Sequence, residues 1–165
     1  PPYFVVHPGA AGPPRRYPPE SFAAAARALA ADTGHAAVLA GSAEDAAQLD
    51  ALQAALAAPV LRMDALPLGQ LAALIEGASV LLCNDRAPAH IAAGVGAPVV
   101  VLYALTNPQH TPWAAHSQVL NHPVACRGCL KSVCPEGHHA CLRGVPPQRV
   151  AAAARDLMMQ GAGAR

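Results

Sequence analysis

Short apolar runs alternate along the chain with longer segments that have the composition of helices. The apolar runs predict strands at residues 3–7, 36–40, 60–61, 79–83, 98–103 and 118–120. The segments between and after them predict helices at residues 20–34, 42–57, 68–76, 87 to 94 or 96, and 146–159. The strands are continuously apolar, which is typical of a parallel sheet covered by helices on both faces. We therefore expect an α/β fold with a Rossmann-like, doubly wound parallel sheet, forming a single domain over residues 1–160.

The composition is that of one compact domain. The chain has 165 residues, of which 53% are hydrophobic and 13% charged, and its formal net charge is +1. This composition excludes a disordered chain, and the lack of a Lys/Arg block argues against a nucleic-acid surface. No apolar run approaches the roughly 18 residues of a membrane span. The opening residues, Pro1-Pro2-Tyr3, lack a Met and a leader-like pattern, so we expect no signal peptide and a fragment of a longer chain.

Three loops that follow expected strands carry polar residues, and ligands of doubly wound sheets bind at such loops. The first loop spans residues 7–18 and contains Gly9, Ala10 and the adjacent Arg15 and Arg16. Small residues let the backbone approach a ligand closely, and two guanidinium groups can clamp a diphosphate. The alternative is a solvated loop with two surface arginines. The loop is not a P-loop, because no Gly-Lys-Ser/Thr follows it.

The second loop supplies two adjacent acids, Glu44 and Asp45, directly after the strand 36–40. A carboxylate at this place in a dinucleotide fold accepts both hydroxyls of a ribose. A helix-capping acid after Ser42 explains the same pattern equally well.

The third loop joins the strand 79–83 to a helix and contains Asp85, Arg86 and Ala87. Backbone N–H groups at such a helix start favour an anion, and Arg86 adds positive charge there. Asp85 is suited to bind sugar hydroxyls. His90 lies one turn into the helix and is either a ligand contact or a buried structural histidine.

A cysteine-rich segment, residues 126–141, precedes the last helix. It contains Cys126, Cys129, Cys134 and Cys141, with His138 and His139 among them. These soft ligands at short spacing suit one structural, tetrahedral zinc ion, and the alternative is reduced cysteines that pack or face solvent. The spacing does not match ferredoxin-type iron–sulfur ligation. We expect Cys83, on an apolar strand, to be a buried apolar residue.

Four motifs together resemble the C-terminal half of glycosyltransferase family 9, the heptosyltransferase-like family of lipopolysaccharide core assembly. In chain order they are His7-Pro8-Gly9-Ala10 with Arg15-Arg16-Tyr17-Pro18, then Gly41-Ser42-Ala43-Glu44, then Asn84-Asp85 with His90, and the cysteine cluster. The resemblance covers nearly the whole chain. It implies the GT-B architecture, in which two Rossmann-like domains face each other across a cleft and the C-terminal one binds the nucleotide-diphosphate sugar.

The resemblance assigns the first two loops to the nucleotide. Arg15 stands where the family has a basic residue that touches the donor phosphates, and Gly9 and Ala10 would line the nucleotide side of that loop. Glu44 would hold the ribose, with the neighbouring Asp45 as the alternative.

The resemblance assigns the third loop to the diphosphate and the sugar. Asp85 would contact the donor sugar, the backbone of Arg86 and Ala87 would face the diphosphate, and His90 would support the loop or contact the donor. Many members have a Ser/Thr-Gly pair where this chain has Arg86-Ala87. Because of this departure, the resemblance defines the identity of the donor less closely than it defines the fold.

The implied function is donor binding, with ADP-heptose as the expected donor, in an inverting transferase of lipopolysaccharide core biosynthesis. No catalytic residue is expected in this chain, because the family's general base is an aspartate of the N-terminal domain. That domain would also bind the lipid A-core acceptor, so we expect the isolated chain to be inactive. No cofactor is required. The expected setting is the bacterial cytoplasm, with peripheral inner-membrane contact in the full-length protein. The alternatives are a non-catalytic nucleotide- or metal-binding module and a GT-B-type sugar-nucleotide epimerase domain.

Overall fold

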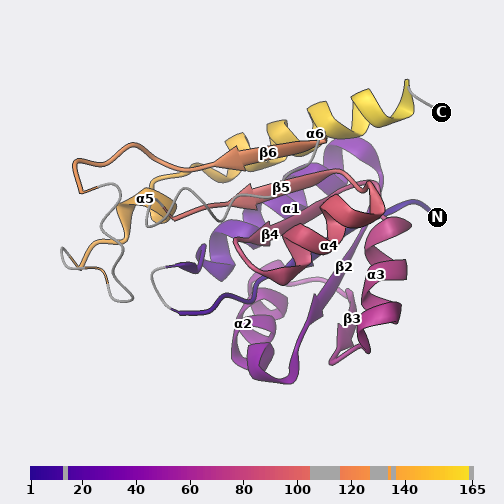
Figure 1. The fold of residues 1–165 in the computed structure, drawn as a ribbon, viewed down its shortest axis with the longest axis horizontal. Coiled ribbons are helices and arrows are strands. Elements are labelled where there is room, and N and C mark those ends of the chain that lie inside the picture. Colours follow the sequence, from indigo (N-terminus) through magenta and orange to yellow (C-terminus); the bar gives the residue numbers. More distant parts are fainter. Residues whose placement is uncertain (13–14, 105–115, 127–133, 135–136, 164–165) are drawn as a thin grey trace.

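One parallel sheet runs through the molecule. The structure, a computed structural model, describes residues 1–12, 15–104, 116–126, 134 and 137–163. Its strands are β1 (Tyr3–His7), β2 (Ala36–Gly41), β3 (Leu61–Asp64), β4 (Leu81–Asn84), β5 (Val99–Leu102) and β6 (Ser117–Leu120), in the order β3-β2-β1-β4-β5-β6 (Figure 1). Every neighbouring pair is parallel. This order is that of a Rossmann fold: β2 and β3 follow on one side of β1, and the chain then crosses back to place β4, β5 and β6 on the other side. The strand order therefore reverses between the neighbouring strands β1 and β4. The predicted fold class is confirmed.

Helices cover both faces of the sheet, as the uniformly apolar strands predicted. They are α1 (Pro19–Thr33), α2 (Ala46–Leu56), α3 (Leu68–Glu76), α4 (Ala87–Val95), α5 (Ala140–Arg143) and α6 (Pro147–Ala162). On one face, α1, α2 and α6 bury a cluster that includes Phe22, Leu52 and Leu157. On the other face, α3 and α4 bury a second cluster that includes Ile75 and Ala92 (Figure 1). The sheet therefore separates two cores.

Proline and glycine mark the ends of the helices. Proline occupies the first turn of α1, α4 and α6, where its missing N–H has no intrahelical partner to lose. Gly34 and Gly96 end α1 and α4 in the left-handed region, with φ of 71° and 73°, which glycine adopts without a steric penalty. The prediction of helix 68–76 matches α3 residue for residue.

Two elements differ from the sequence prediction. The third strand begins at Leu61 and continues through Arg62 to Asp64, because it is an edge strand that tolerates charged residues and so lacks a continuous apolar run. The short helix α5 was not predicted, since four residues give no readable period. It lies on the side toward which β5 and β6 run (Figure 1). Within the described residues, no helix has the length and apolar character needed to span a membrane.

Candidate functional site

The candidate site lies where the carboxyl ends of β1, β2 and β4 meet, next to the point at which the strand order reverses. His7 ends β1 and lies opposite Cys83, one residue before Asn84 ends β4. A pocket of about 230 Å³ opens here. Strand ends, the turn after β3, α3 and the start of α4 supply its lining: His7, Ala40, Gly41, Ser42, Ala43, Asp45, Met63, Ala65, Leu66, Leu71, Arg86, Ala87 and Pro88. Ligands of doubly wound sheets bind at this kind of position.

Two larger pockets, of about 520 and 630 Å³, lie near the opposite ends of the strands. Both include His35, which precedes β2, and mainly apolar surface lines them. The charged residues Asp32 and Arg155 in one of them pair with each other between α1 and α6. We therefore place the candidate site at the smaller pocket, where the polar loops converge.

Asp45 is the buried anion of this site. It ends the 3₁₀ helix η2 (Ala43–Asp45), and its side chain forms a capping box with Ser42. The Ser42 N–H and hydroxyl both donate to Oδ2, at 2.8 and 2.9 Å, and Arg86 donates to Oδ1 at 2.6 Å. Burial alone would raise the pKa of Asp45, but these hydrogen bonds from Ser42 and Arg86 outweigh it and hold the pKa below its ordinary value. Asp45 is therefore ionised at neutral pH.

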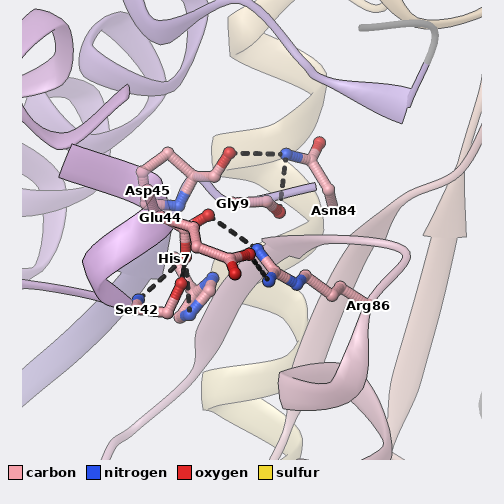
Figure 2. A network of polar contacts seen from close by, with 8 residues as sticks. His7, Gly9, Ser42, Glu44, Asp45, Asn84 and Arg86 are labelled. Carbon is pink, nitrogen blue, oxygen red and sulfur yellow. Dashed lines mark hydrogen bonds and ion pairs between the residues drawn. The ribbon is translucent and has the colours of Figure 1, made fainter. Parts of the chain in front are cut away.

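Arg86 joins the third loop to the second. It precedes α4, and its side chain is 26% exposed. Besides its bond to Asp45, one guanidinium nitrogen lies 3.9 Å from the carboxylate of Glu44, whose side chain is 87% exposed (Figure 2). One cation at the pocket wall thus faces a buried carboxylate and an exposed one.

His7 lies beneath this ion pair. It is 3% exposed, and its Nε2 atom lies 3.9 Å from Oδ2 of Asp45. Burial lowers the pKa of His7 to about 4, because the attraction of Asp45 only partly offsets burial and the repulsion of Arg86 lowers the pKa further. His7 is therefore neutral at pH 7, and the buried charge at this place is the Asp45–Arg86 pair.

Asn84 joins the third loop to the first. It is fully buried, and its amide nitrogen donates to the carbonyls of Pro8 at 3.0 Å and Gly9 at 3.4 Å. Its amide oxygen accepts a bond from the Tyr17 N–H at 2.9 Å. The sequence analysis includes Asn84 in the third motif but assigns it no role. The available signal was a polar amide ending an otherwise apolar strand, next to the residues assigned to the ligand.

The predicted residues of the second and third loops gather at this place. Arg86 and Ala87 line the pocket, and Glu44 reaches Arg86 from outside it. Asp85 is buried, and its backbone N–H donates to the Leu102 carbonyl at 3.2 Å. His90 is exposed on α4, so the alternative of a buried structural histidine is wrong.

The predicted residues of the first loop lie beside this pocket. Gly9 and Ala10 are buried, and Arg15 is half-buried. Gly9 packs so closely on Asp45 that a Cβ atom at this position would lie 2.5 Å from the carboxyl group. Glycine is thus required at position 9 by this close approach. None of Gly9, Ala10, Arg15 and His90 is among the residues lining the pocket.

The cysteine-rich segment is described only in part. Cys129 lies outside the described residues, and Cys126, Cys134 and Cys141 are half-buried. Among the described residues, no group of three or more possible ligands is close enough to hold a metal ion. Structural zinc and reduced cysteines thus both stay open as predictions for this segment. Cys83 is buried at 1% exposure, and burial raises the pKa of its thiol, which confirms it as a packed residue.

Known proteins are similar to nearly the whole chain in sequence and in fold. The profile of "Glycosyltransferase family 9 (heptosyltransferase)" matches residues 1–140. Lipopolysaccharide heptosyltransferase 2 of Escherichia coli K12 is 31% identical over 155 residues, which are 90% of this chain and 44% of the relative. The solved E. coli ADP-heptose LPS heptosyltransferase II superposes with a TM-score of 0.79 at 30% identity, over 97% of this chain and 47% of that one.

Two further solved structures have the same fold. The family 9 glycosyltransferase of Veillonella parvula gives a TM-score of 0.79 at 26% identity, over 96% of this chain and 46% of that one. The iron-containing heptosyltransferase TibC, solved with ADP-D-β-D-heptose, gives 0.75 at 13% identity, over 96% and 46%. This chain therefore spans less than half the length of these relatives, and it belongs to glycosyltransferase family 9, the heptosyltransferase family.

Proposed function

We propose that this chain is the donor-binding domain of an inverting glycosyltransferase of lipopolysaccharide core biosynthesis, and that the donor is a nucleoside-diphosphate sugar such as ADP-heptose. The observation that carries the proposal is a pocket lined by the second and third loops at the reversal of strand order, with the first loop packed beside it where Gly9 contacts Asp45. The ADP-heptose bound to TibC supports this class of ligand, since that protein shares the fold.

The diphosphate would meet positive charge and backbone N–H groups. Arg86 and Ala87 stand at the start of α4, where the helix dipole favours an anion. The Arg86 guanidinium is already fixed by Asp45, so it presents its remaining N–H groups without a further entropic cost. Arg15 would add a second cation from the first loop, beside the backbone of Gly9 and Ala10.

The ribose and the donor sugar would meet the carboxylates. Asp45 already accepts three hydrogen bonds from Ser42 and Arg86, of the about four that a carboxylate can accept, so accepting both ribose hydroxyls would require it to give up a partner. Glu44, at 87% side-chain exposure, has room to accept two hydroxyl groups. This difference favours Glu44 for the ribose. Asp85 and His90 remain our assignments for the donor sugar.

Transfer itself would need the other half of the enzyme. In the inverting reaction, an acceptor hydroxyl loses its proton to a general base and attacks the anomeric carbon, while the nucleoside diphosphate leaves from the opposite face. Arg15, Arg86 and the start of α4 would stabilise the negative charge that develops on the leaving diphosphate. The base and the lipid A-core acceptor site would belong to an N-terminal domain, at the cytoplasmic side of the inner membrane. We therefore expect this chain to bind donor without transferring sugar.

The test is a melting experiment with ADP, UDP and GDP. We expect ADP to raise the melting temperature and the variants Arg15→Ala and Glu44→Ala to weaken that shift. Matched controls replace the exposed residues Arg143 and Glu76 by Ala and should keep the shift. Absence of a shift with every nucleotide would contradict the proposal.

The zinc prediction has a separate test. Cys126, Cys129, Cys134 and Cys141 would supply four ligands, which closes a tetrahedral site and makes it structural. Elemental analysis of protein purified without chelators should find one zinc per chain. A content far below one equivalent would exclude the site.

A further inference from the structure

One buried amide holds both ends of the first loop. The Asn84 side chain uses its amide nitrogen and its amide oxygen on the segment from Pro8 to Tyr17. The carbonyls of Pro8 and Gly9 begin this segment, and the N–H of Tyr17 ends it. Because the amide group is planar and fully buried, it fixes the separation of the two ends. We call this segment the clamped loop, and its described residues are 8–12 and 15–17.

The end of the clamped loop has a second attachment. The Tyr17 hydroxyl donates to the Val145 carbonyl at 2.7 Å, and its ring packs edge-on against Phe22 with centroids 5.0 Å apart. Burial raises the pKa of Tyr17 to about 12, so the hydroxyl keeps its proton. Tyr17 thus positions its ring without Asn84. The backbone N–H of Tyr17, and the carbonyls of Pro8 and Gly9, depend on the Asn84 amide.

The start of the clamped loop also has little room to shift. Gly9 rests against the carboxyl group of Asp45, so the backbone at Gly9 is held from one side by Asn84 and bounded on the other by Asp45 (Figure 2). Arg15 and Arg16 directly precede Tyr17. The hydrogen bond from the Tyr17 N–H to Asn84 therefore fixes the backbone directly after these two cations, shortly before α1 begins at Pro19.

We propose that Asn84 is a positioning residue that holds the clamped loop, and with it the cations Arg15 and Arg16, at the diphosphate of a bound nucleotide. The inference rests on the proposed donor site and deepens it. Asn84 acts through the loop and touches no ligand. Its loss weakens the contacts to the diphosphate and leaves those to the base and the ribose, which other loops supply.

The test compares ADP with adenosine as probes. The ratio of their dissociation constants isolates the contribution of the diphosphate. Asn84→Asp keeps the shape and an acceptor for Tyr17 but puts an oxygen against the carbonyls of Pro8 and Gly9, and Asn84→Ala removes all three bonds. We expect ADP to bind both variants about tenfold more weakly, a change of about 1.4 kcal/mol, while adenosine binding stays the same.

The control variant is Leu157→Ala, in the core on α6 and remote from the clamped loop. It lowers the melting temperature without changing the ratio, so a general loss of stability does not imitate the effect. All constants are measured below the melting temperature of the least stable variant. An unchanged ratio in Asn84→Asp and Asn84→Ala would overturn the inference and leave the donor site standing. No ADP binding by the wild-type chain would overturn both.

If the Asn84 variants do not fold, amide hydrogen exchange of the wild-type chain tests the hydrogen bond from Tyr17 to Asn84. The Tyr17 amide, although in a loop, should exchange with solvent as slowly as amides of the sheet, because it bonds to a fully buried acceptor. Its exchange is followed by NMR beside that of the exposed Ala11. Equally fast exchange of the two amides would refute the clamp.

Discussion

Asn84 and Arg86 flank Asp85 and tie its loop to two different neighbours by different kinds of bond. Asn84 is fully buried and uses neutral hydrogen bonds to the loop after β1. Arg86 is partly exposed and uses ion pairs to the loop after β2. Neutral bonds in a dry interior respond little to pH or salt, whereas ion pairs near solvent respond to both. The Asn84 connection is therefore insensitive to pH and salt in the folded protein, whereas the Arg86 connection responds to pH, to salt and to an added anion.

This difference matters for a site that receives a diphosphate. A buried amide that loses its partners leaves polar groups without compensation, so the Asn84 connection stays closed in the native state. The Arg86 guanidinium has N–H groups left over after its bond to Asp45, and solvent reaches it. The site thus combines a neutral, buried side at β1 with a charged, partly exposed side at β2.

Acidification should have the largest effect on the stability of this site, because it protonates His7 beside the Asp45–Arg86 pair. The pKa of His7 is lowered to about 4 in the folded protein, so between its ordinary value and pH 4 the unfolded chain binds a proton that the folded chain does not. Stability therefore falls as pH falls through this window, by roughly 3 kcal/mol in total. Below this pH window, protonation of Asp45, whose pKa is also lowered, removes further stability. Urea unfolding at a series of pH values measures the loss.

A substitution assigns this pH dependence to His7. His7→Gln should flatten the slope between pH 6.5 and 4 by up to about 1.4 kcal/mol per pH unit, the value for one proton. His90→Gln, at an exposed position, is the control and should keep the wild-type slope. Identical slopes in wild type and His7→Gln would rule out His7 as the source.

Gly9→Ala changes the residue that contacts both Asn84 and Asp45. The Gly9 carbonyl accepts a bond from Asn84, while its α-carbon lies against Asp45. An added methyl group must displace either the loop or a carboxylate that Ser42 and Arg86 hold, at a cost of about 2 kcal/mol. Thermal unfolding measures the loss. Gly94→Ala, exposed on α4 with open space around it, is the control and should be neutral or stabilising. Equal stability of the two variants would contradict the tight contact.

The fold was largely predictable from the sequence because its signals are local. Continuous apolar strands, prolines in first helical turns and glycines after helices all point to the same α/β arrangement. The prediction failed where the signal is tertiary. The predicted strand at residues 60–61 extends to Asp64 through pairing with β2, over residues too polar to indicate this extent. In α5, the four residues are too few to show a period.

The candidate site was predictable as a set of loops but not as a network. The rule that ligands bind at carboxyl ends of strands located Glu44, Asp85 and Arg86 correctly at one edge of the sheet. Which carboxylate pairs with Arg86 depends on side-chain geometry across two loops, which no spacing encodes. The role of Asn84 likewise depends on partners 67 and 76 residues away in the chain.

Arg86→Ala weakens the charged side with a smaller effect on stability. Asp45 keeps its bonds from Ser42 but loses its cation, and because Arg86 is partly exposed we expect a loss of about 1 kcal/mol. High salt should shrink the difference from wild type. The control Arg62→Ala removes ion pairs to Asp50 and Asp64, whose carboxylates are well exposed, and should cost less. Chemical unfolding at low and high salt measures both variants. A larger loss in Arg62→Ala would contradict the special place of the buried pair.

Glu44→Gln should have the smallest effect on stability and a clear effect on the ligand. The ion pair to Arg86 spans 3.9 Å and Glu44 is 87% exposed, so the loss of unfolding free energy should stay below about 0.5 kcal/mol. If Glu44 accepts the ribose hydroxyls, ADP should bind about tenfold more weakly to the variant, because a charged acceptor is lost. Titration with ADP and 2′-deoxy-ADP sharpens the assignment: wild type should discriminate between them, and Glu44→Gln should do so much less. Glu76→Gln is the control with unchanged discrimination. Full discrimination in Glu44→Gln would move the ribose contact to another residue and leave Glu44 as a surface partner of Arg86.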